Sequence, residues 1–430
     1  MLTLGFYGAY LAALVGVVAL VPRVRRLDPD RATRIAGAVL PAVAGLVLLL
    51  TDCPWFGDFD SAYYPAGQAT LSASLSYATD CVSGFVNIPL VAALFAPFAW
   101  FSYPVAVGLF TLLGLAAIAW TFVLLRRICE ATRLESLMIA SLMALAGPLW
   151  YSVREGNTTH LVFPLLLTTW LQRHRRPAVA GVCLATAAVI KLPLVVMGAY
   201  FLWRRQWSAI TAAIVTGVCI GGLSLLVFGR ELHESWMASC IIQPSGQPIP
   251  AFNVQSIDGL LARLSGGSLL SWTPMQTGAG FRATRTLIIG ALAAWVCSAL
   301  WRHGPGVTRR ADLLEFSAVL VFTIVVFPVS WTHYYLLLLM PLAVLFVTHT
   351  VPRPPWQQVA IVAAAAGVLL PLRTPPTAPG SPLHLLLSIV PSSLTLIGGL
   401  MLLWLLLREH AREGHEIGVE IGRPSLGGGD

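Results

Sequence analysis

Acidic residues stand close together between residues 52 and 64 of this chain, among tryptophan, phenylalanine and tyrosine residues. A carboxylate there could take a proton from a hydroxyl group, so Asp58 or Asp60 is a candidate general base, with the other as a possible second carboxylate. The two would point the same way in an extended segment and diverge on a helix. The plainer alternative is that both are solvated or cap a helix. The aromatic neighbours suit an interfacial belt or a sugar-binding surface, the latter with Tyr63 and Tyr64.

A second polar group follows at Arg154, Glu155 and Asn157. The guanidinium group of Arg154 is suited to holding a phosphate through two hydrogen bonds, and a surface pair with Glu155 is the alternative. Lys191 is the only lysine in the chain and lies between two short apolar halves, just before Pro193. Such a lysine either snorkels to the interface or has a function. The free-energy cost of an ionisable group inside the membrane favours a function.

Two more groups contain residues suited to binding. His333 follows Trp331, and a histidine there could donate to a phosphate, carry a proton or support the structure. Asn253 and Gln255 lie in a polar stretch that begins a short helix, and they either bind sugar hydroxyls or satisfy the loop backbone.

The composition indicates a membrane protein with many crossings. The chain is 57% hydrophobic and 11% charged, with a mean hydropathy of +0.77, whereas soluble domains carry about 25% charged residues. The net charge of +8 could suggest a nucleic-acid partner. However, the arginines lie in short loops between apolar runs, so the charge reports topology instead. The first apolar run, 3–21, lacks signal-peptide features and is expected to be a retained span.

Apolar stretches predict the membrane-spanning helices. We expect an all-α polytopic protein with about 12 to 13 transmembrane helices and a large first external loop. The predicted spans are 3–21, 35–51, 104–125, 135–150, 158–172, 177–190, 192–203, 207–228, 284–301, 313–328, 334–348, 358–371 and 383–407.

The distribution of arginines predicts which loops face outward. Placing most arginines on the cytoplasmic side makes the large loops 52–103 and 229–283 external, together with every candidate residue above except Lys191. Segment 85–101 contains Pro89 and Pro97, so we expect an interfacial or re-entrant helix instead of a crossing. Residues 1–407 are expected to form one transmembrane catalytic domain, followed by a cytoplasmic tail at 408–430.

Two of the seven cysteines flank the first external loop. Cys53 and Cys81 lie in a compartment that permits disulfides, and a bridge between them would join the ends of the loop that holds Asp58. Their spacing alone does not establish that they are close enough.

The sequence lacks the signatures of metal and nucleotide sites. It has no zinc-type cluster of histidine and cysteine, no phosphate-binding glycine loop and no dinucleotide fingerprint. We therefore expect no cofactor and no metal. A donor that already lies in the membrane, such as a polyprenyl phosphate that carries a sugar, suits the external polar groups better than a cytosolic sugar nucleotide.

The order of these motifs resembles a known family, the actinobacterial polyprenyl-phosphate-dependent mannosyltransferases of the GT-C fold. The resemblance covers nearly the whole chain and is greatest to the mannosyltransferases that extend phosphatidyl-myo-inositol mannosides. Many relatives carry Gly-Gln-x-Asn where this chain has Glu155-Gly156-Asn157. The motifs that carry the resemblance are Gly57–Asp60, Tyr63-Tyr64, Gly156-Asn157, Ile190–Pro193, Asn253–Gly259 and Ser330–Tyr334.

The resemblance implies an inverting transfer of mannose that forms an α-1,2 linkage on the periplasmic face of a bacterial cell membrane. Asp58 is then the expected general base, and Asp60 is the alternative. The expected partners are a lipid-linked sugar donor, a glycolipid acceptor and membrane lipids. Lys191, Arg154 and His333 are the expected ligands of the donor phosphate, and the sugar or acceptor ligands are Tyr63, Tyr64, Glu155, Asn157, Trp331, Asn253 and Gln255.

Two alternative functions stay open at this point. A lipid or solute transporter would use the broken helix at Lys191 as a translocation site, but no inverted repeat is visible and the polar groups gather on one face. A transferase with a pentose donor or a lipomannan acceptor is the nearer alternative, because sugar choice depends on pocket shape.

Overall fold

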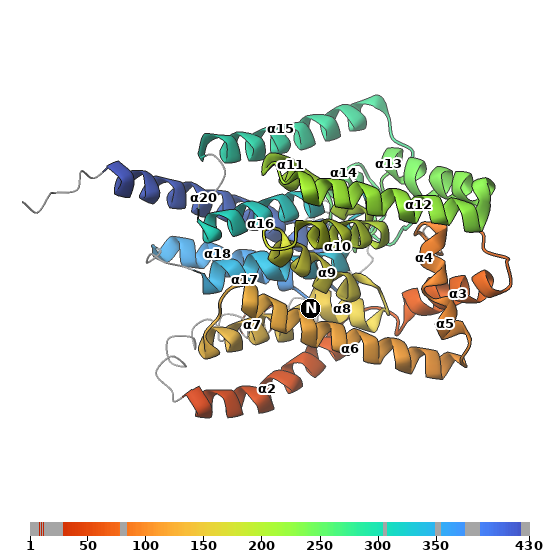
Figure 1. Ribbon diagram of the computed structural model, residues 1–430, viewed down its shortest axis with the longest axis horizontal. Coiled ribbons are helices and arrows are strands. Elements are labelled where there is room, and N and C mark those ends of the chain that lie inside the picture. The colour runs from red at the N-terminus through yellow and green to blue at the C-terminus, as the bar shows by residue number, and fades with distance from the viewer. Residues whose placement is uncertain are drawn as a thin grey trace, which may run out of the picture.

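The computed structural model describes residues 29–77, 84–303, 308–348, 354–374 and 388–422, with positions 8, 10 and 12 near the amino terminus. Within these ranges the chain is helical, and its only β-type pairing is an isolated bridge between Val254 and Trp331. Most of the long helices run along the long axis of the molecule (Figure 1). The predicted span 3–21 lies almost entirely outside the described residues.

Many of the helices are apolar, and several are long enough to cross a membrane. In the described ranges, five candidate spans meet both criteria, and α7 and α8 together form a sixth that is bent by 54°. Four shorter apolar helices accompany them. The main helices are α2 (Pro29–Leu50), α6 (Tyr103–Ile128), α7 (Arg133–Leu145), α8 (Gly147–Arg154), α9 (Thr159–Gln172), α10 (Pro177–Ile190), α11 (Gly198–Trp203), α12 (Trp207–Trp236), α15 (Ala279–His303), α16 (Arg309–Val326), α17 (Leu339–Val347), α18 (Pro355–Leu369) and α20 (Leu394–Gly422).

The break at Lys191 has a local cause in the sequence. Helix α10 ends at Ile190, and the 3₁₀ helix η2 (Leu192–Met197) begins at the next residue but one. Proline has no backbone N–H to donate, and its ring clashes with the carbonyl of the residue four positions earlier in a helix, so Pro193 prevents α10 from continuing. Lys191 itself has φ −131° and ψ 88°, outside the helical region.

The first external loop forms a cap of short helices at one end of the bundle, seen at the right of Figure 1. Segment 85–101 contains α4 (Pro89–Ala93) and α5 (Ala96–Ala99) and makes no crossing. Ahead of it lie one π-helical turn, η1 (Phe59–Tyr63), and α3 (Tyr64–Leu71). Phe59 is fully buried, with its ring 4.7 Å from that of Phe110 on α6. This aromatic contact fixes the backbone next to Asp58.

Charged side chains are buried at the start of α16, and their partners come from the end of α9, from α11 and from α20. Asp312 on α16 accepts hydrogen bonds from Arg173 and Tyr200, and Glu315 pairs with His410 at 3.0 Å. Helix α20 continues past residue 407 to Gly422, and Glu409 and His410 are buried. The segment expected to begin a soluble tail is therefore part of the last helix.

Candidate active site

A tight turn after α8 holds the segment that carries Asp58. The backbone N–H of Asp58 donates to the carbonyl of Glu155 at 2.9 Å, and that of Phe56 donates to the carbonyl of Arg154. Gly156 has φ +67°, and a Cβ atom there would lie 2.7 Å from the Cβ of Phe59. The turn therefore requires glycine, both for its backbone angles and for the close approach of Phe59.

Asn157 links a carboxylate to the lone lysine. Its Nδ2 donates to Oδ2 of Asp58 at 2.5 Å, and its Oδ1 accepts from Nζ of Lys191 at 2.9 Å. The side chain cannot turn over freely, because Oδ1 also accepts hydrogen bonds from the backbone and the hydroxyl group of Thr159. Lys191 is buried, and its Nζ lies 5.0 Å from the ring centre of Tyr334. The side-chain amide of Asn157 thus lies between Asp58 and Lys191 and holds both of them at the same site.

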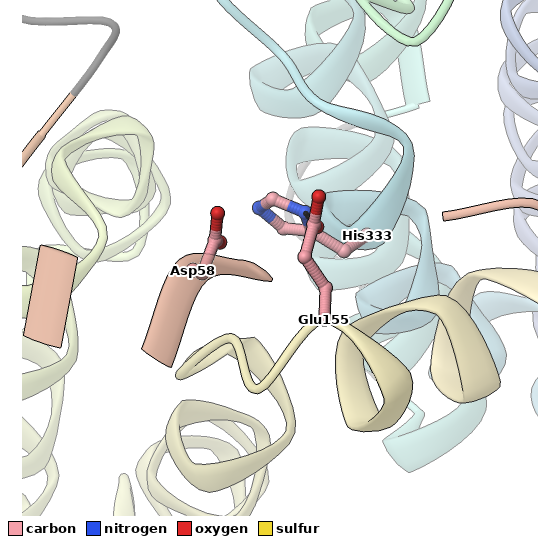
Figure 2. Close-up of side chains that lie close together, drawn as sticks. All are labelled: Asp58, Glu155 and His333. Carbon is pink, nitrogen blue, oxygen red and sulfur yellow. Dashed lines mark ion pairs between the residues drawn. The ribbon is translucent and has the colours of Figure 1, made fainter. Parts of the chain in front are cut away.

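Glu155 and His333 also lie close to Asp58. Figure 2 shows the three side chains converging from the segment before η1, the turn after α8, and the 3₁₀ helix η4 (Thr332–Leu338). Nδ1 of His333 is 3.4 Å from Oε2 of Glu155. One ligand-type atom from each of Asp58, Glu155 and His333 lies within 4.8 Å of the others. Groups so spaced suit a divalent cation or acid–base chemistry, and the Lys191 ammonium group already supplies positive charge to Asp58.

The two carboxyl groups differ in their surroundings. Burial raises the pKa of Asp58 above its usual range, while the hydrogen bond from Asn157 and the charge of Lys191 act in the opposite direction. Burial raises the pKa of Glu155 well above its usual range, and the negative charge of Asp58 raises it further. Two adjacent carboxyl groups resist ionising together. The hydrogen bond from Asn157 favours the ionised form of Asp58, so Glu155 is the better placed of the two to hold a proton.

The second external loop positions η4. The N–H of Thr332 donates to the carbonyl of Asn253 at 2.8 Å, and the N–H of Gln255 donates to the carbonyl of Ser330. These bonds flank the bridge between Val254 and Trp331. Although this loop is far away in sequence, it aligns the residues that lead into His333.

All of these groups open into one cavity of about 1020 Å³. Its polar end is lined by Asp58, Glu155, Asn157, Lys191 and His333. The remainder is mostly apolar and follows α10, η2, α11 and α12, with Leu184, Ala188, Val195, Phe201 and Ile214 in its wall. A polar head joined to a long apolar limb is suited to an amphipathic ligand.

The match to a family model decides the class. The model of glycosyltransferase family 87 matches residues 85–328, more than half of the chain. The chain belongs to glycosyltransferase family 87. The prediction of an all-α, polytopic membrane glycosyltransferase is confirmed by this match together with the helical architecture and the candidate spans.

Two curated relatives match much of this family 87 chain. A protein of Mycolicibacterium smegmatis is 27% identical over 387 residues, which is 83% of this chain and 84% of the relative. One of Mycobacterium tuberculosis is 27% identical over 270 residues, 59% of this chain and 60% of the relative. Both are named polyprenol-phosphate-mannose-dependent alpha-(1-2)-phosphatidylinositol mannoside mannosyltransferases.

Among solved structures, ArnT from Cupriavidus metallidurans bound to undecaprenyl phosphate aligns with 90% of this chain and 79% of its own. The sequence identity is 13% and the TM-score is 0.43. A score at that level does not by itself establish a shared fold.

Several residues predicted from the sequence line the cavity of this family 87 enzyme. Among the expected sugar ligands, Tyr63 and Trp331 do so, and Tyr63 shares a hydrogen bond of 3.2 Å with Thr158. Asn253 also reaches the cavity, but its side chain is bonded to Tyr151 and Trp272. Asn253 therefore positions neighbouring aromatic side chains.

Arg154 does not line the cavity, contrary to the expected phosphate contact. Its guanidinium group donates to the carbonyl oxygens of Leu48, Leu49 and Thr51 at the end of α2 and stacks on Trp55 at 4.7 Å. The free carbonyls at a helix C-terminus attract a cation, and this attraction explains the placement.

Asp60, Tyr64 and Gln255 also lie outside the cavity lining. Asp60 is exposed, and Tyr64 donates to the carbonyl of Phe101. Gln255 is fully buried, and its amide bonds the backbone of Phe252, Ser392 and Leu396. Gln255 satisfies loop backbone, which was the plainer of its two interpretations.

The suggested bridge between Cys53 and Cys81 is not formed, because Cys53 is a buried free thiol. Cys81 lies outside the described residues. Cys240, in the second external loop and in the cavity wall, is disulfide-bonded. The sequence argument missed Cys240 because it lies in an apolar stretch.

Asn87 is a cavity residue that the sequence analysis did not identify. It lies between α3 and α4, and its Nδ2 donates to the carbonyl of Ile190 at 2.6 Å, beside the break at Lys191. An amide in the otherwise apolar segment 85–101 was the available signal.

Proposed function

We propose that this enzyme transfers mannose from polyprenyl-phosphate-mannose to a phosphatidyl-myo-inositol mannoside, forming an α-1,2 linkage with inversion on the periplasmic face. The observation that carries the proposal is the chain Asp58–Asn157–Lys191 at the polar head of the cavity. The names of the mycobacterial relatives support this donor and acceptor.

The shape of the cavity supports a lipid-linked donor. The apolar limb along α10 and α12 receives the polyprenyl chain, while the sugar phosphate lies in the polar head. A cavity of about 1020 Å³ is large for a small soluble substrate.

The mechanism needs one base and a stabilised leaving group. Asp58 takes the proton of the acceptor hydroxyl group as that oxygen bonds to the anomeric carbon from the face opposite the phosphate. The bond from the anomeric carbon to the phosphate oxygen breaks, and its electron pair stays on the phosphate. Lys191 and His333 hold that phosphate as its charge grows, and Tyr63, Asn157 and Trp331 orient the sugars. A second carboxylate nucleophile is not required.

The same arrangement supports transfer without a metal ion. The ammonium group of Lys191 supplies the fixed positive charge that a metal would otherwise give to the leaving phosphate. The distribution of arginines supports a periplasmic site, because the head of the cavity is built mainly from loops expected to face outward.

The test is transfer from labelled polyprenyl-phosphate-mannose by purified variants. Asp58→Asn is expected to lower turnover by about 10²- to 10⁴-fold, the usual contribution of a general base. Asp60→Asn is the matched control, because Asp60 is exposed and lies outside the cavity lining, and it is expected to keep wild-type activity. Activity of the wild type is expected to persist with a chelator present.

The outcomes separate the alternatives. Wild-type turnover of Asp58→Asn would refute the assignment, and loss in Asp60→Asn alone would exchange the two roles. Faster turnover with a polyprenyl-phosphate-pentose than with polyprenyl-phosphate-mannose would show that the transferred sugar is a pentose. Movement of labelled lipid across vesicles without any transfer would favour a transporter.

A further inference from the structure

Glu155 and His333 are buried side by side in an arrangement that binding of the donor phosphate alone does not explain. His333 is 4% exposed, and neither of its ring nitrogens has a hydrogen-bond partner among the described residues at normal distances. Its nearest acidic neighbour is Glu155, with Oε2 at 3.4 Å from Nδ1. A buried polar group without a partner is costly, so this one calls for a ligand or a role in the reaction.

The reaction moves a proton as well as a sugar. The acceptor hydroxyl group loses its proton when its oxygen bonds to the anomeric carbon. The departing phosphate monoester gains negative charge and binds a second proton with a pKa of about 6. A phosphate monoester with this pKa can take up a proton as the bond to the anomeric carbon breaks, so a path across the site would bring the proton lost by the hydroxyl group to the charge that grows on the phosphate.

We propose that Asp58, Glu155 and His333 form a proton relay that carries this proton from the acceptor hydroxyl group to the leaving phosphate. The inference rests on the proposed function. The three groups come from three separate elements, yet one ligand-type atom of each lies within 4.8 Å of the others (Figure 2). They thus form one cluster that extends from the general base to His333.

The steps of the relay balance. Asp58 takes the acceptor proton. Glu155 gives its proton to Nδ1 of His333, and the imidazole gives the proton on its other nitrogen to the phosphate oxygen that keeps the electron pair of the broken bond. Asp58 then passes its proton to Glu155. Both carboxyl groups return to their starting states, and the ring stays neutral and exchanges tautomers with water after the product leaves.

The charges around the relay support this order. Glu155 faces Asp58, Lys191 and Tyr151, and burial together with the charge of Asp58 raises its pKa, so it begins with a proton to give. His333 faces Lys191 and His160 in addition to Glu155. A second cation beside Lys191 is disfavoured until the phosphate brings negative charge. Proton transfer to His333 is therefore coupled to departure of the phosphate.

Glu155→Gln tests the relay, because it keeps the size and hydrogen-bonding capacity of the side chain but cannot pass on a proton. Turnover is expected to fall by about 10²-fold or more at pH 8, with the KM for the donor unchanged. The loss is expected to grow as the pH rises, because the proton must then come from water. Glu155→Asp restores a titratable group and is expected to recover part of the turnover with the wild-type pH profile.

Control variants separate the relay from a structural role. Asp60→Asn removes an exposed carboxylate outside the cavity lining and is expected to leave the pH profile unchanged. His333→Gln is expected to lower turnover in the same pH-dependent way and to weaken donor binding as well.

Two results would overturn the relay. One is wild-type turnover and pH profile in Glu155→Gln. The other is a loss in that variant that is independent of pH and accompanied by a lower thermal unfolding midpoint. If the wild type itself transfers no mannose under these conditions, the proposed function fails instead, and that outcome is seen before any variant is made.

Discussion

At the scale of single residues, Asn157 decides the electrostatics of the site. It joins Asp58 to Lys191 with one amide, and Thr159 fixes the orientation of that amide. Asp58, the proposed base, and Lys191, the proposed phosphate ligand, are thereby linked through hydrogen bonds to Asn157 without forming a direct ion pair. Without Asn157 the two would form a direct ion pair or lose contact, and either arrangement would spoil one of the two roles.

Lys191→Ala is expected to weaken binding of the lipid-linked donor. A hydrogen bond to a charged group contributes about 1.5–3 kcal/mol, so the KM for the donor should rise by about 10- to 100-fold. Lys191→Arg keeps the positive charge and should recover part of the affinity. The measurement is initial rate against donor concentration, and unchanged saturation in Lys191→Ala would contradict the phosphate contact.

The residue pattern alone did not distinguish Asp58 from Asp60, and the family resemblance favoured Asp58. The choice depends on local geometry, since side chains two residues apart diverge on a helix. Asp58 has helical angles (φ −69°, ψ −37°), so Asp58 lines the cavity while Asp60 is exposed. Arg154 was misassigned for a related reason, because the helix end that it binds is adjacent only in the folded chain.

At the scale of elements, the turn between α8 and α9 organises the site. It supplies Glu155 and Asn157 as side chains and the carbonyl that anchors Asp58. It also meets the first external loop at Gly156, where Phe59 leaves no room for a side chain. One short turn thereby sets the distance between the base and its partners.

Gly156→Ala is expected to destabilise the protein by about 1–3 kcal/mol. The positive φ at this position is strained for any residue other than glycine, and the Cβ of alanine would clash with Phe59. Turnover should fall as well, since Asp58 moves with Phe59. Gly221→Ala on α12 is the matched control, with open space around the new Cβ, and should be neutral or slightly stabilising. Thermal unfolding in detergent measures both. Equal midpoints for the two variants would refute the role of Gly156.

The sequence predicted the positions of the helices better than it predicted which helices and loops pack together. Proline and apolar length indicated the helices and the break at Lys191, but segment 85–101, expected to form one interfacial or re-entrant helix, forms the two short helices α4 and α5. The pairing of the second external loop with η4 had no local signal, because it joins backbone atoms far apart in the chain. Likewise, the charged residues of α20 after position 407 were expected to form a soluble tail. Their ion-pair partners lie on α16, far away in the sequence, so no local pattern indicated that they are buried.

At the scale of the whole molecule, the head of the cavity and the buried Arg173–Asp312 pair lie at opposite ends of α9. Helix α9 begins beside Asn157 and ends beside Arg173, and its 14 residues span about 21 Å. The Arg173–Asp312 pair is almost fully buried, so it holds α9 against α16 far from the cavity head.

Asp312→Asn is expected to destabilise the bundle by about 3–5 kcal/mol, because it leaves the buried Arg173 without its carboxylate partner. Turnover of the folded fraction should stay close to that of the wild type. Asp30→Asn breaks an exposed pair with Arg133 and should cost at most about 1 kcal/mol. Unfolding midpoints, compared with turnover per folded molecule, test this division. Loss of turnover in Asp312→Asn without loss of stability would contradict it.

The two parts of the cavity also make sugar choice and lipid length separable traits. The polar head is built from turns and loops, whereas the apolar limb is built from the faces of α10, η2, α11 and α12. A lineage could therefore adopt a donor with a longer or shorter isoprenoid chain by exchanging small apolar residues along the helices, without altering a group that touches the sugar. The same separation lets a designer change the tail specificity of this enzyme and leave its chemistry intact.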